Sequence, residues 1–404
     1  MTAWGLAWRT VARSPARSVL AVSGVTVIGA LLFNMLLLSR GLLVSFHDLL
    51  DSAGFDIRVV SGQGSMIQRP PIADAASLAE AIARLPEVQR VTLLRADVAL
   101  ADAAGRREPT LRVTLIGTSD SSTGASWTIV KGTALPSAAA PGGPPPIIVS
   151  AGLASELQLE PGSALQLRLV PSGSASARPP VVARVVGVGV FAFEAADDYT
   201  VATTIHGFAA VHGVADDGQA EMVLVASRPD AGLAAAAAIA RLRPDLRALS
   251  NDQVVEQFNQ NAFSYFKQIS VVLSSMTLAF AFLLIATLLT MSVNQRLGEV
   301  AALRALGFPR RRIAANLLWE SALLVGVGGV AALPVGGLLA IVLDRILRQM
   351  PGVPARLHFF VFEPRTVVLH AALLCATGVL AALYPIWLAA RLPIAATLRR
   401  EIVS

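Results

Sequence analysis

The residue types that carry out catalysis are present in this chain, but they do not stand at catalytic spacings. The chain has two lysines, Lys131 and Lys267, and neither follows a G-x-x-x-x-G run, so the chain lacks the P-loop that cradles nucleotide phosphates. No G-x-S-x-G sequence presents a serine nucleophile, and no H-E-x-x-H sequence presents two histidines to zinc. We therefore expect no catalysis here, and we expect any linked ATP hydrolysis to take place on another chain.

One group of acidic and histidine side chains has the chemistry of a divalent-metal site. Its members are Asp197, Asp198, His206, His212, Asp216 and Asp217. Carboxylates and imidazoles bind divalent metals, but this spacing matches no ligand motif, and Asp-Asp-Gly at 216–218 is ordinary turn chemistry. We therefore predict no metal site. The single cysteine, Cys375, leaves no disulfide framework or cysteine cluster.

The composition points to a lipid bilayer. Apolar residues make up 54% of the 404 residues and charged residues 15%, and the mean hydropathy is +0.62. In soluble domains, apolar residues make up about 45–50% and charged residues about 25%. A helix of about 20 residues crosses about 30 Å of hydrocarbon. Four apolar windows are long enough, namely residues 19–38, 269–293, 321–343 and 366–390. The first is longer than the apolar core of a signal peptide and has no A-x-A-like cleavage site after it, so we expect it to remain as an anchor.

The charge distribution predicts the orientation. Segments 1–18, 294–320 and 391–404 together carry 11 basic and three acidic residues, whereas residues 39–268 carry 18 basic and 22 acidic residues. Because cytoplasmic loops are enriched in Lys and Arg, we expect both termini and the loop 294–320 in the cytoplasm, and residues 39–268 outside. The short outer loop 344–365 has four basic and two acidic residues and fits this rule less well. The topology explains the net charge of +6, so no nucleic-acid surface is predicted.

The long segment 39–268 has mixed patterning. Helical spacing recurs in 74–85 and 234–242, and strand-like runs occur at 111–116, 147–150, 164–170 and 181–190. Loops rich in proline and glycine at 136–146 and 171–180 divide it into two subdomains. The predicted fold class is therefore a membrane protein of four transmembrane α-helices, one before and three after a large α+β extracytoplasmic domain.

Amphipathic helical patterns flank that domain at both ends. Leucines and Phe46 recur at helical spacing over residues 42–50, and valines, Phe258 and Phe266 do so over 254–266. The first and second membrane spans are therefore predicted to continue outward, and two such helices in contact would form a stiff stalk. The pattern is equally compatible with two ordinary packed helices of the domain.

The third span carries a stripe of small residues at four-residue spacing. Its members are Gly328, Ala332, Gly336 and Ala340. Such a stripe lets another helix backbone approach closely, and the partner can be another span of this chain or a second copy. Pro334 and two Gly-Gly pairs make this span kinkable. His370 is an ionisable group inside the fourth span, which we interpret as a neutral imidazole near the outer boundary.

The loop 294–320 is the most patterned polar segment. It contains a short helical stretch with Val300, Leu303 and Leu306 on one side; Gly307 can end this helix, and Pro309 can start the next element. Such a helix suits a groove in a partner protein. The alternative is an interfacial helix that anionic lipid holds through Arg310–Arg312.

This loop resembles the FtsX/MacB/LolC-type permeases of ABC transporters. The family pattern there is E-R-x-x-E-[IV]-G-x-L-[RK]-A-[LI]-G, then basic residues, an Ile and a Glu. The chain matches it at Arg296, Glu299, Leu303–Gly307, Arg310–Ile313 and Glu320, and departs from it at Gln295 and Ala301. The tail from Pro385 to Arg399 is similar to the family's P-x-x-x-A-A-R-x-x-P-[IV]-x-x-L-R ending. Looser similarities lie at 85–88, 131–132 and 147–150.

The resemblance implies a stand-alone permease subunit of a bacterial ABC transporter. It implies that residues 294–313 form a coupling helix against a separate ATPase subunit, present in two copies, and that a second permease copy or paralogue completes the assembly. The residues that the resemblance implies for contact with this partner are Gly298, Glu299, Leu303, Arg304, Ala305, Leu306, Gly307, Arg310, Arg311 and Arg312. Export or lipoprotein release would follow from movement of the outer domain, without a cofactor on this chain, because the partner binds the ATP. The expected location is the bacterial inner membrane, in contact with lipid and with periplasmic or outer-membrane partners.

Two other functions remain open from the sequence. An FtsX-like regulator would use the same motion to activate cell-wall hydrolases and would transport nothing, although its outer domain is usually smaller. A membrane-anchored sensor would need no ATPase, but it would leave the patterned loop 294–320 unexplained.

Overall fold

A computed structural model describes residues 15–63, 70–103, 110–120, 127–136, 143–169, 179–213, 218–261, 264–295, 310–354 and 356–391. The chain divides into two compact units. The helical unit comprises residues 1–42, 262–345 and 359–404, and the sheet unit comprises residues 43–261 and 346–358.

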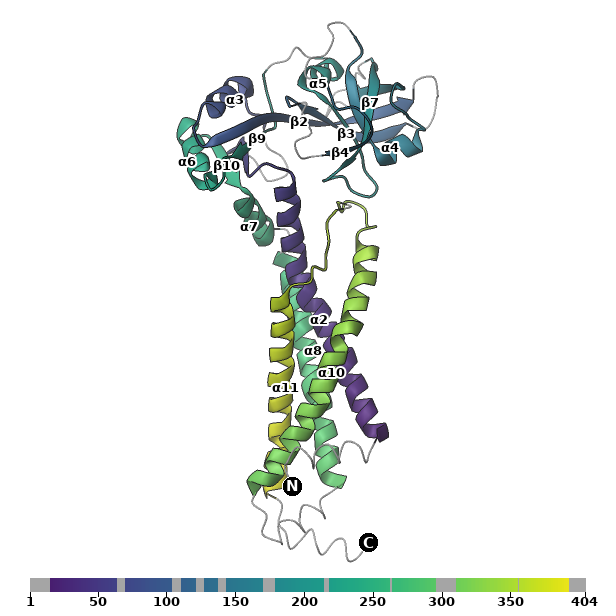
Figure 1. The fold of residues 1–404 in the computed structure, drawn as a ribbon, viewed down its shortest axis with the longest axis vertical. Helices are drawn as coiled ribbons and strands as arrows, with labels where there is room; N and C mark the ends of the chain where they lie inside the picture. Colours follow the sequence, from purple (N-terminus) through teal and green to yellow (C-terminus); the bar gives the residue numbers. More distant parts are fainter. Residues whose placement is uncertain are drawn as a thin grey trace, which may run out of the picture. The chain divides into compact units, whose positions relative to one another are not determined.

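In the described part of the chain, four helices are long and apolar enough to cross a membrane. They are α2 (Pro15–Ser52), α8 (Ser264–Gln295), α10 (Arg310–Leu347) and α11 (Pro364–Arg391). Their shared core includes Leu32, Ile285, Leu289, Val325 and Leu374. A helix makes all its backbone hydrogen bonds within its own segment, which is what a long apolar segment would need in hydrocarbon. Figure 1 shows them running side by side.

The strands of the sheet unit lie between the first and second of these helices in the chain, and the described ones form one mixed ten-stranded sheet. The strands are β1 (Ile57–Ser61), β2 (Val88–Ala103), β3 (Leu111–Thr118), β4 (Trp127–Gly132), β5 (Pro146–Ser150), β6 (Ala164–Leu169), β7 (Val181–Phe191), β8 (Tyr199–Thr204), β9 (Met222–Ser227) and β10 (Leu246–Ser250). The order is β10-β1-β9-β2-β3-β8-β5-β7-β4, and β6 pairs with β2 and β7. Most pairs are antiparallel; β3–β8 and β5–β7 are parallel.

Two apolar cores divide the sheet unit into two subdomains. One core lies where α3 (Ala75–Ala83) and α6 (Gly232–Leu242) pack beside β1 and β9. The other lies where α4 (Ala151–Glu156) and α5 (Ile205–His212) pack beside β3, β5 and β7. Strand β2 contributes to both, and Figure 1 shows the helix pairs at opposite ends of the sheet. The predicted fold class is thereby confirmed: four apolar helices and an α+β domain inserted after the first.

The first and last strands of the main segment of the sheet unit, residues 43–261, are neighbours in the sheet. Helix α2 leads into β1, and β10 leads into α7 (Asn251–Asn261). Strands β1 and β10 pair antiparallel from Ile57–Ser250 to Ser61–Leu246. The end of α2 and the start of α7 are therefore next to adjacent strands.

Candidate functional site

Most of the residues predicted to contact a partner cannot be placed. Gly298, Glu299, Leu303, Arg304, Ala305, Leu306 and Gly307 lie outside the described residues. Helix α10 begins with Arg310, Arg311 and Arg312, which form its first turn. Among the described residues, a candidate site lies at the junction between α2, β1 and α7.

The small-residue stripe of α10 faces α2 of the same chain. A Cβ atom added to Gly328 would lie 2.7 Å from the Cβ of Val25, and one added to Gly336 would lie 3.0 Å from a ring carbon of Phe33. Ala332 is fully buried, and Ala340 packs in a cluster with Phe33. A span of this chain therefore occupies the face whose partner the sequence left open.

The ends of α2 and α7 contact each other within the sheet unit. The rings of Phe46 and Phe258 meet edge to face, with their centroids 4.7 Å apart. Both are among the aromatic residues that the helical spacing places on the apolar faces of the flanking helices. An edge-to-face aromatic pair adds to the energy of simple burial.

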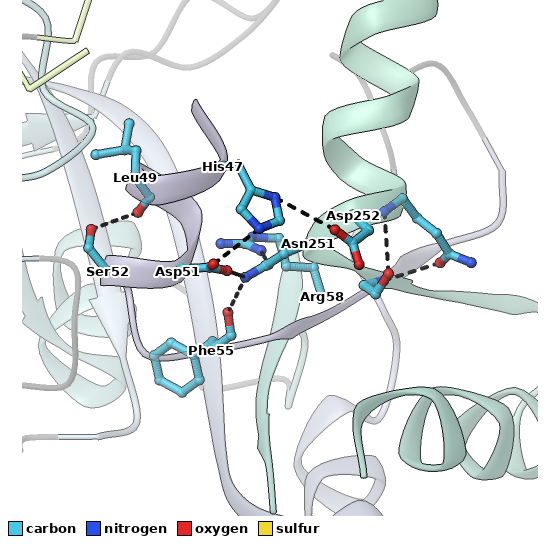
Figure 2. Close-up of polar contacts among 10 residues, drawn as sticks. His47, Leu49, Asp51, Ser52, Phe55, Arg58, Asn251 and Asp252 are labelled. Atoms are coloured by element: carbon cyan, nitrogen blue, oxygen red, sulfur yellow. Dashed lines mark hydrogen bonds and ion pairs between the residues drawn. The ribbon is translucent and has the colours of Figure 1, made fainter. Parts of the chain in front are cut away.

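Asn251 is the centre of the polar junction, as Figure 2 shows. Its side-chain amide donates to Asp51 Oδ1 at 2.6 Å and to the carbonyl oxygen of Phe55 at 3.2 Å. Its side-chain oxygen accepts a hydrogen bond from Arg58. Its backbone N–H donates to the carbonyl oxygen of Asp56 at 3.0 Å. One buried residue at the start of α7 therefore binds the end of α2, the connecting turn and β1.

Arg58 supplies a buried positive charge to this junction. Arg58 is 9% exposed, and burial lowers the pKa of its guanidinium to about 10. The negative charges of Asp51 and Asp56 raise this pKa and so oppose part of the effect of burial. The guanidinium is therefore still charged at neutral pH. A buried charge is tolerated when it is hydrogen-bonded and near an opposite charge. Strand β1 can therefore bury Arg58 because Asn251 hydrogen-bonds the guanidinium and Asp51 lies near it.

His47 extends the network to a second acidic residue (Figure 2). Its Nε2 lies 3.2 Å from Asp51 Oδ2, and its Nδ1 lies 3.7 Å from Asp252 Oδ1. A neutral imidazole has one N–H group and can donate to one of these carboxylates, whereas the imidazolium can donate to both. The ring thus bridges α2 and α7, although Asp252 is largely exposed, so water screens its contact with His47.

The segment between α10 and α11 also packs on the sheet unit, which the sequence did not reveal. The backbone N–H of Gly352 donates to Asp197 Oδ1 at 2.9 Å, and that of His358 donates to Ser45 Oγ at 2.7 Å. Pro354 forms an isolated bridge with Ala195. Part of the predicted outer loop 344–365 is thereby held against the domain at two separate places.

The remaining candidates for chemistry lie apart. His212 pairs with Asp97 at 3.5 Å, whereas Asp197 binds Gly352, and Asp216 and Asp217 fall outside the described residues. Among the residues that the structure describes, no three His, Cys, Asp or Glu side chains could hold a metal ion. His370 is buried in α11 against the ring of Phe33, with the ring centroids 5.3 Å apart.

Asn251 and Arg58 were not identified as site residues from the sequence, because they meet through a strand pairing between segments almost 200 residues apart. Two local signals point to them: Arg58 interrupts an apolar run, and Asn251 stands where a helical pattern begins. Neither signal identifies the other residue as its partner.

Comparison with known proteins gives matches over most of the chain. Residues 271–394 match the family model described as FtsX-like permease C-terminal, and residues 18–243 match the one described as MacB-like periplasmic core domain. No curated protein matches the chain by sequence.

Two solved structures are similar to part of the chain. One is the periplasmic region of MacB from Actinobacillus actinomycetemcomitans, with 12% identity and a TM-score of 0.40, over 52% of this chain and 95% of that one. The other is the extracellular domain of the ABC-type transporter YknZ from Gram-positive bacteria, with 13% identity and a TM-score of 0.35, over 48% of this chain and 99% of that one.

Proposed function

This chain belongs to the MacB/FtsX-type family of ABC transporter permeases, and on that premise we propose that it couples ATP hydrolysis by a separate ATPase to movement of its outer domain. The family is generally non-catalytic, and its ABC ATPase partners carry out the hydrolysis. The specific role that we propose is export or lipoprotein release by transmission of force across the bacterial inner membrane.

The junction at Asn251 is the observation that carries this proposal. Strands β1 and β10 pair directly, and each continues into one of the two flanking helices. Asn251 joins Asp51 of α2 to Arg58 of β1. Because buried polar networks are costly to break in part, a displacement of either helix would move the paired strands with it instead of being absorbed locally.

The polar groups of the membrane spans support a mechanical role over a transport path. Thr277, Thr287 and Thr377 donate to carbonyl oxygens of their own helices. Among the described residues, the buried Ser292 hydroxyl of α8 bonds Glu320 near the start of α10. Hydroxyl groups that hydrogen-bond within their own helix or to a neighbouring helix need no hydrophilic channel as a partner.

The proposed assembly has two ATPase subunits, which bind the ATP, and a second permease copy or paralogue. Both termini and the loop 294–320 would face the cytoplasm, in line with the excess of basic residues there. The outer domain would face the periplasm and meet periplasmic or outer-membrane partners. This chain would need no cofactor of its own.

The coupling segment provides the test. Glu299→Ala and Arg304→Ala are expected to lower ATP-driven export at least about tenfold, about 1.4 kcal/mol of coupling, while membrane insertion stays unchanged. The measurement compares ATP hydrolysis with release of a labelled cargo in the purified complex, with Arg84→Ala as the control, since Arg84 is an exposed arginine of the sheet unit. Full coupling in both variants would refute the assignment of 294–313. If the complex activates cell-wall hydrolysis and releases no cargo, the alternative function of an FtsX-like regulator of cell-wall hydrolases would be favoured.

A further inference from the structure

Two hydrogen bonds fix how α2 lies along α10. Thr26 Oγ1 donates to the carbonyl oxygen of Gly328 at 3.2 Å, and Asn34 Nδ2 donates to that of Gly336 at 3.0 Å. In both pairs the partners are 302 residues apart in the sequence. A constant separation means that the two helices run in the same direction and meet at one axial register.

The two backbones approach so closely that larger side chains are excluded. A Cβ atom added to Gly29 of α2 would lie 2.8 Å from the Cβ of Ala332, just as one added to Gly328 would lie 2.7 Å from the Cβ of Val25. Small residues on both helices therefore bring the carbonyl oxygens of α10 within reach of the side chains of α2.

The position of Asn34 makes a shifted register unfavourable. The residue is 1% exposed, and its amide also donates to Ala30 of its own helix at 2.9 Å. A shift of one residue moves a helix by about 1.5 Å along its axis, which would draw the amide away from Gly336. Hydrocarbon offers no water to replace that partner.

The two bonded carbonyl groups lie on either side of Pro334, the proline inside α10. Proline has no N–H group and its ring clashes with the preceding turn, so a helix deforms most easily there. Gly328 precedes this point and Gly336 follows it. Helix α2 is consequently bonded to both halves of α10.

We propose that Thr26 and Asn34 are positioning residues that hold α2 in a fixed register on α10, so that a force on the start of α10 also moves α2. We call the two hydrogen bonds, from Thr26 to Gly328 and from Asn34 to Gly336, the lock. This inference rests on the proposed function, because it takes the push to arrive through residues 294–313. Helix α10 begins at Arg310, directly after that segment. Helix α2 continues to Ser52, beside Asp51 of the Asn251 junction.

The first measurement tests the lock without any ATPase. The double variant Thr26→Val with Asn34→Leu removes both donors at nearly constant volume. Nitroxide labels at Leu31→Cys and Leu338→Cys, both exposed positions, report the distance between the helices in the full chain in lipid nanodiscs, with Cys375→Ser as the background. We expect one narrow distance in the parent and a broadened or second distance in the double variant. An unchanged distribution would overturn the lock.

Two control variants separate the lock from general damage to the helices. Thr377→Val removes a hydroxyl that bonds Leu373 of its own helix at 2.8 Å, and is expected to leave the distance unchanged. Thr26→Ser keeps the hydroxyl and is expected to retain the parent distance. Broadening in the controls to the same extent as in the double variant would count against a specific role for the two donors.

The second measurement tests transmission in the complex with the ATPase. A label at the exposed Asp48→Cys on each permease copy reports ATP-driven movement. The double variant is expected to lose at least about half of that movement while ATP hydrolysis stays within about twofold of the parent, and Thr26→Ser should retain it. Full movement in the double variant would overturn transmission through the lock. If the parent binds no ATPase, the proposed function is wrong. The first measurement then still shows whether Thr26 and Asn34 hold the two helices in one register.

Discussion

Asn251 shows how one amide can hold a charged group and two main-chain segments at once. Its side-chain oxygen accepts from the buried Arg58, and its side-chain nitrogen donates to Asp51 and to the carbonyl oxygen of Phe55. Because an amide has a donor and an acceptor end, it can join a cation to an anion without carrying charge. A leucine of similar volume would leave both charged groups without this partner.

We therefore expect Asn251→Leu to loosen β1 and β10 in the full chain. Leaving buried polar groups unpaired costs about 1–3 kcal/mol, which corresponds to about 5- to 150-fold faster amide hydrogen exchange in segments that open locally. Hydrogen exchange followed by mass spectrometry over residues 57–61 and 246–250 measures this change. Gln253→Leu is the matched control, since its amide oxygen accepts from Ser250 at an exposed position. Equal exchange in both variants would contradict the central role of Asn251.

Glu194 predicts a dependence of stability on pH. Burial raises the pKa of its carboxyl group, although hydrogen bonds from Ser150 and Thr200 oppose this, and Asp198 raises it further. A carboxyl group whose pKa is raised by folding favours the folded state when protonated. That contribution is complete below the pKa of the unfolded chain and is lost as the pH rises through the pKa of the folded state.

Glu194→Gln should therefore raise the unfolding temperature more at pH 7–8 than at pH 4, which lies below the raised pKa of the folded carboxyl group. Gln keeps the side-chain oxygen that accepts from Thr200 at 2.9 Å. Thermal unfolding followed by intrinsic fluorescence at both pH values measures the difference, and Glu156→Gln, at an exposed position of α4, is the control. A gain of equal size at both pH values would rule out ionisation as its cause.

At the scale of elements, long helices and buried strands were the most predictable parts. The predicted helix 234–242 corresponds to α6, and the predicted strand 181–190 corresponds to β7. Strand β7 pairs with β4, β5 and β6, and its alternate residues from Ala183 to Phe191 are buried, whereas Val182 and Val190 on the other face are exposed. Periodicity detects such elements because burial on a fixed face determines the residue types.

Strand β2 was not predictable, although it is the longest strand described. Its buried residues recur at irregular intervals, because it pairs with β9 along its first part and with β3 and β6 along its second. The face that is buried therefore changes along the strand. Simple alternation of apolar and polar residues is lost, and the pattern is not that of a strand with one buried face.

For the whole molecule, the order of apolar windows was sufficient to predict one helix, a large domain and three helices. The Asn251 junction was not predictable, because it depends on which strands of the domain become neighbours. The expected outward helices at 42–50 and 254–266 come close to it, since Phe46 and Phe258 are the residues that meet. Helical spacing shows which face is apolar, but not that the two faces pack on each other.

The coupling function requires that the start of α10 and the sheet unit face opposite compartments. We expect a membrane-impermeant maleimide to label Ser155→Cys, at an exposed position of the sheet unit, in spheroplasts, and to label Arg310→Cys only after permeabilisation. The physical reason is the excess of basic residues in segments 1–18, 294–320 and 391–404, which opposes their translocation. Each substitution is made in a Cys375→Ser background, and the unsubstituted background is the control for labelling. If both positions react from the same side, a push from a cytoplasmic ATPase cannot reach an outer domain, and the role of α10 as the receiver of force fails with it.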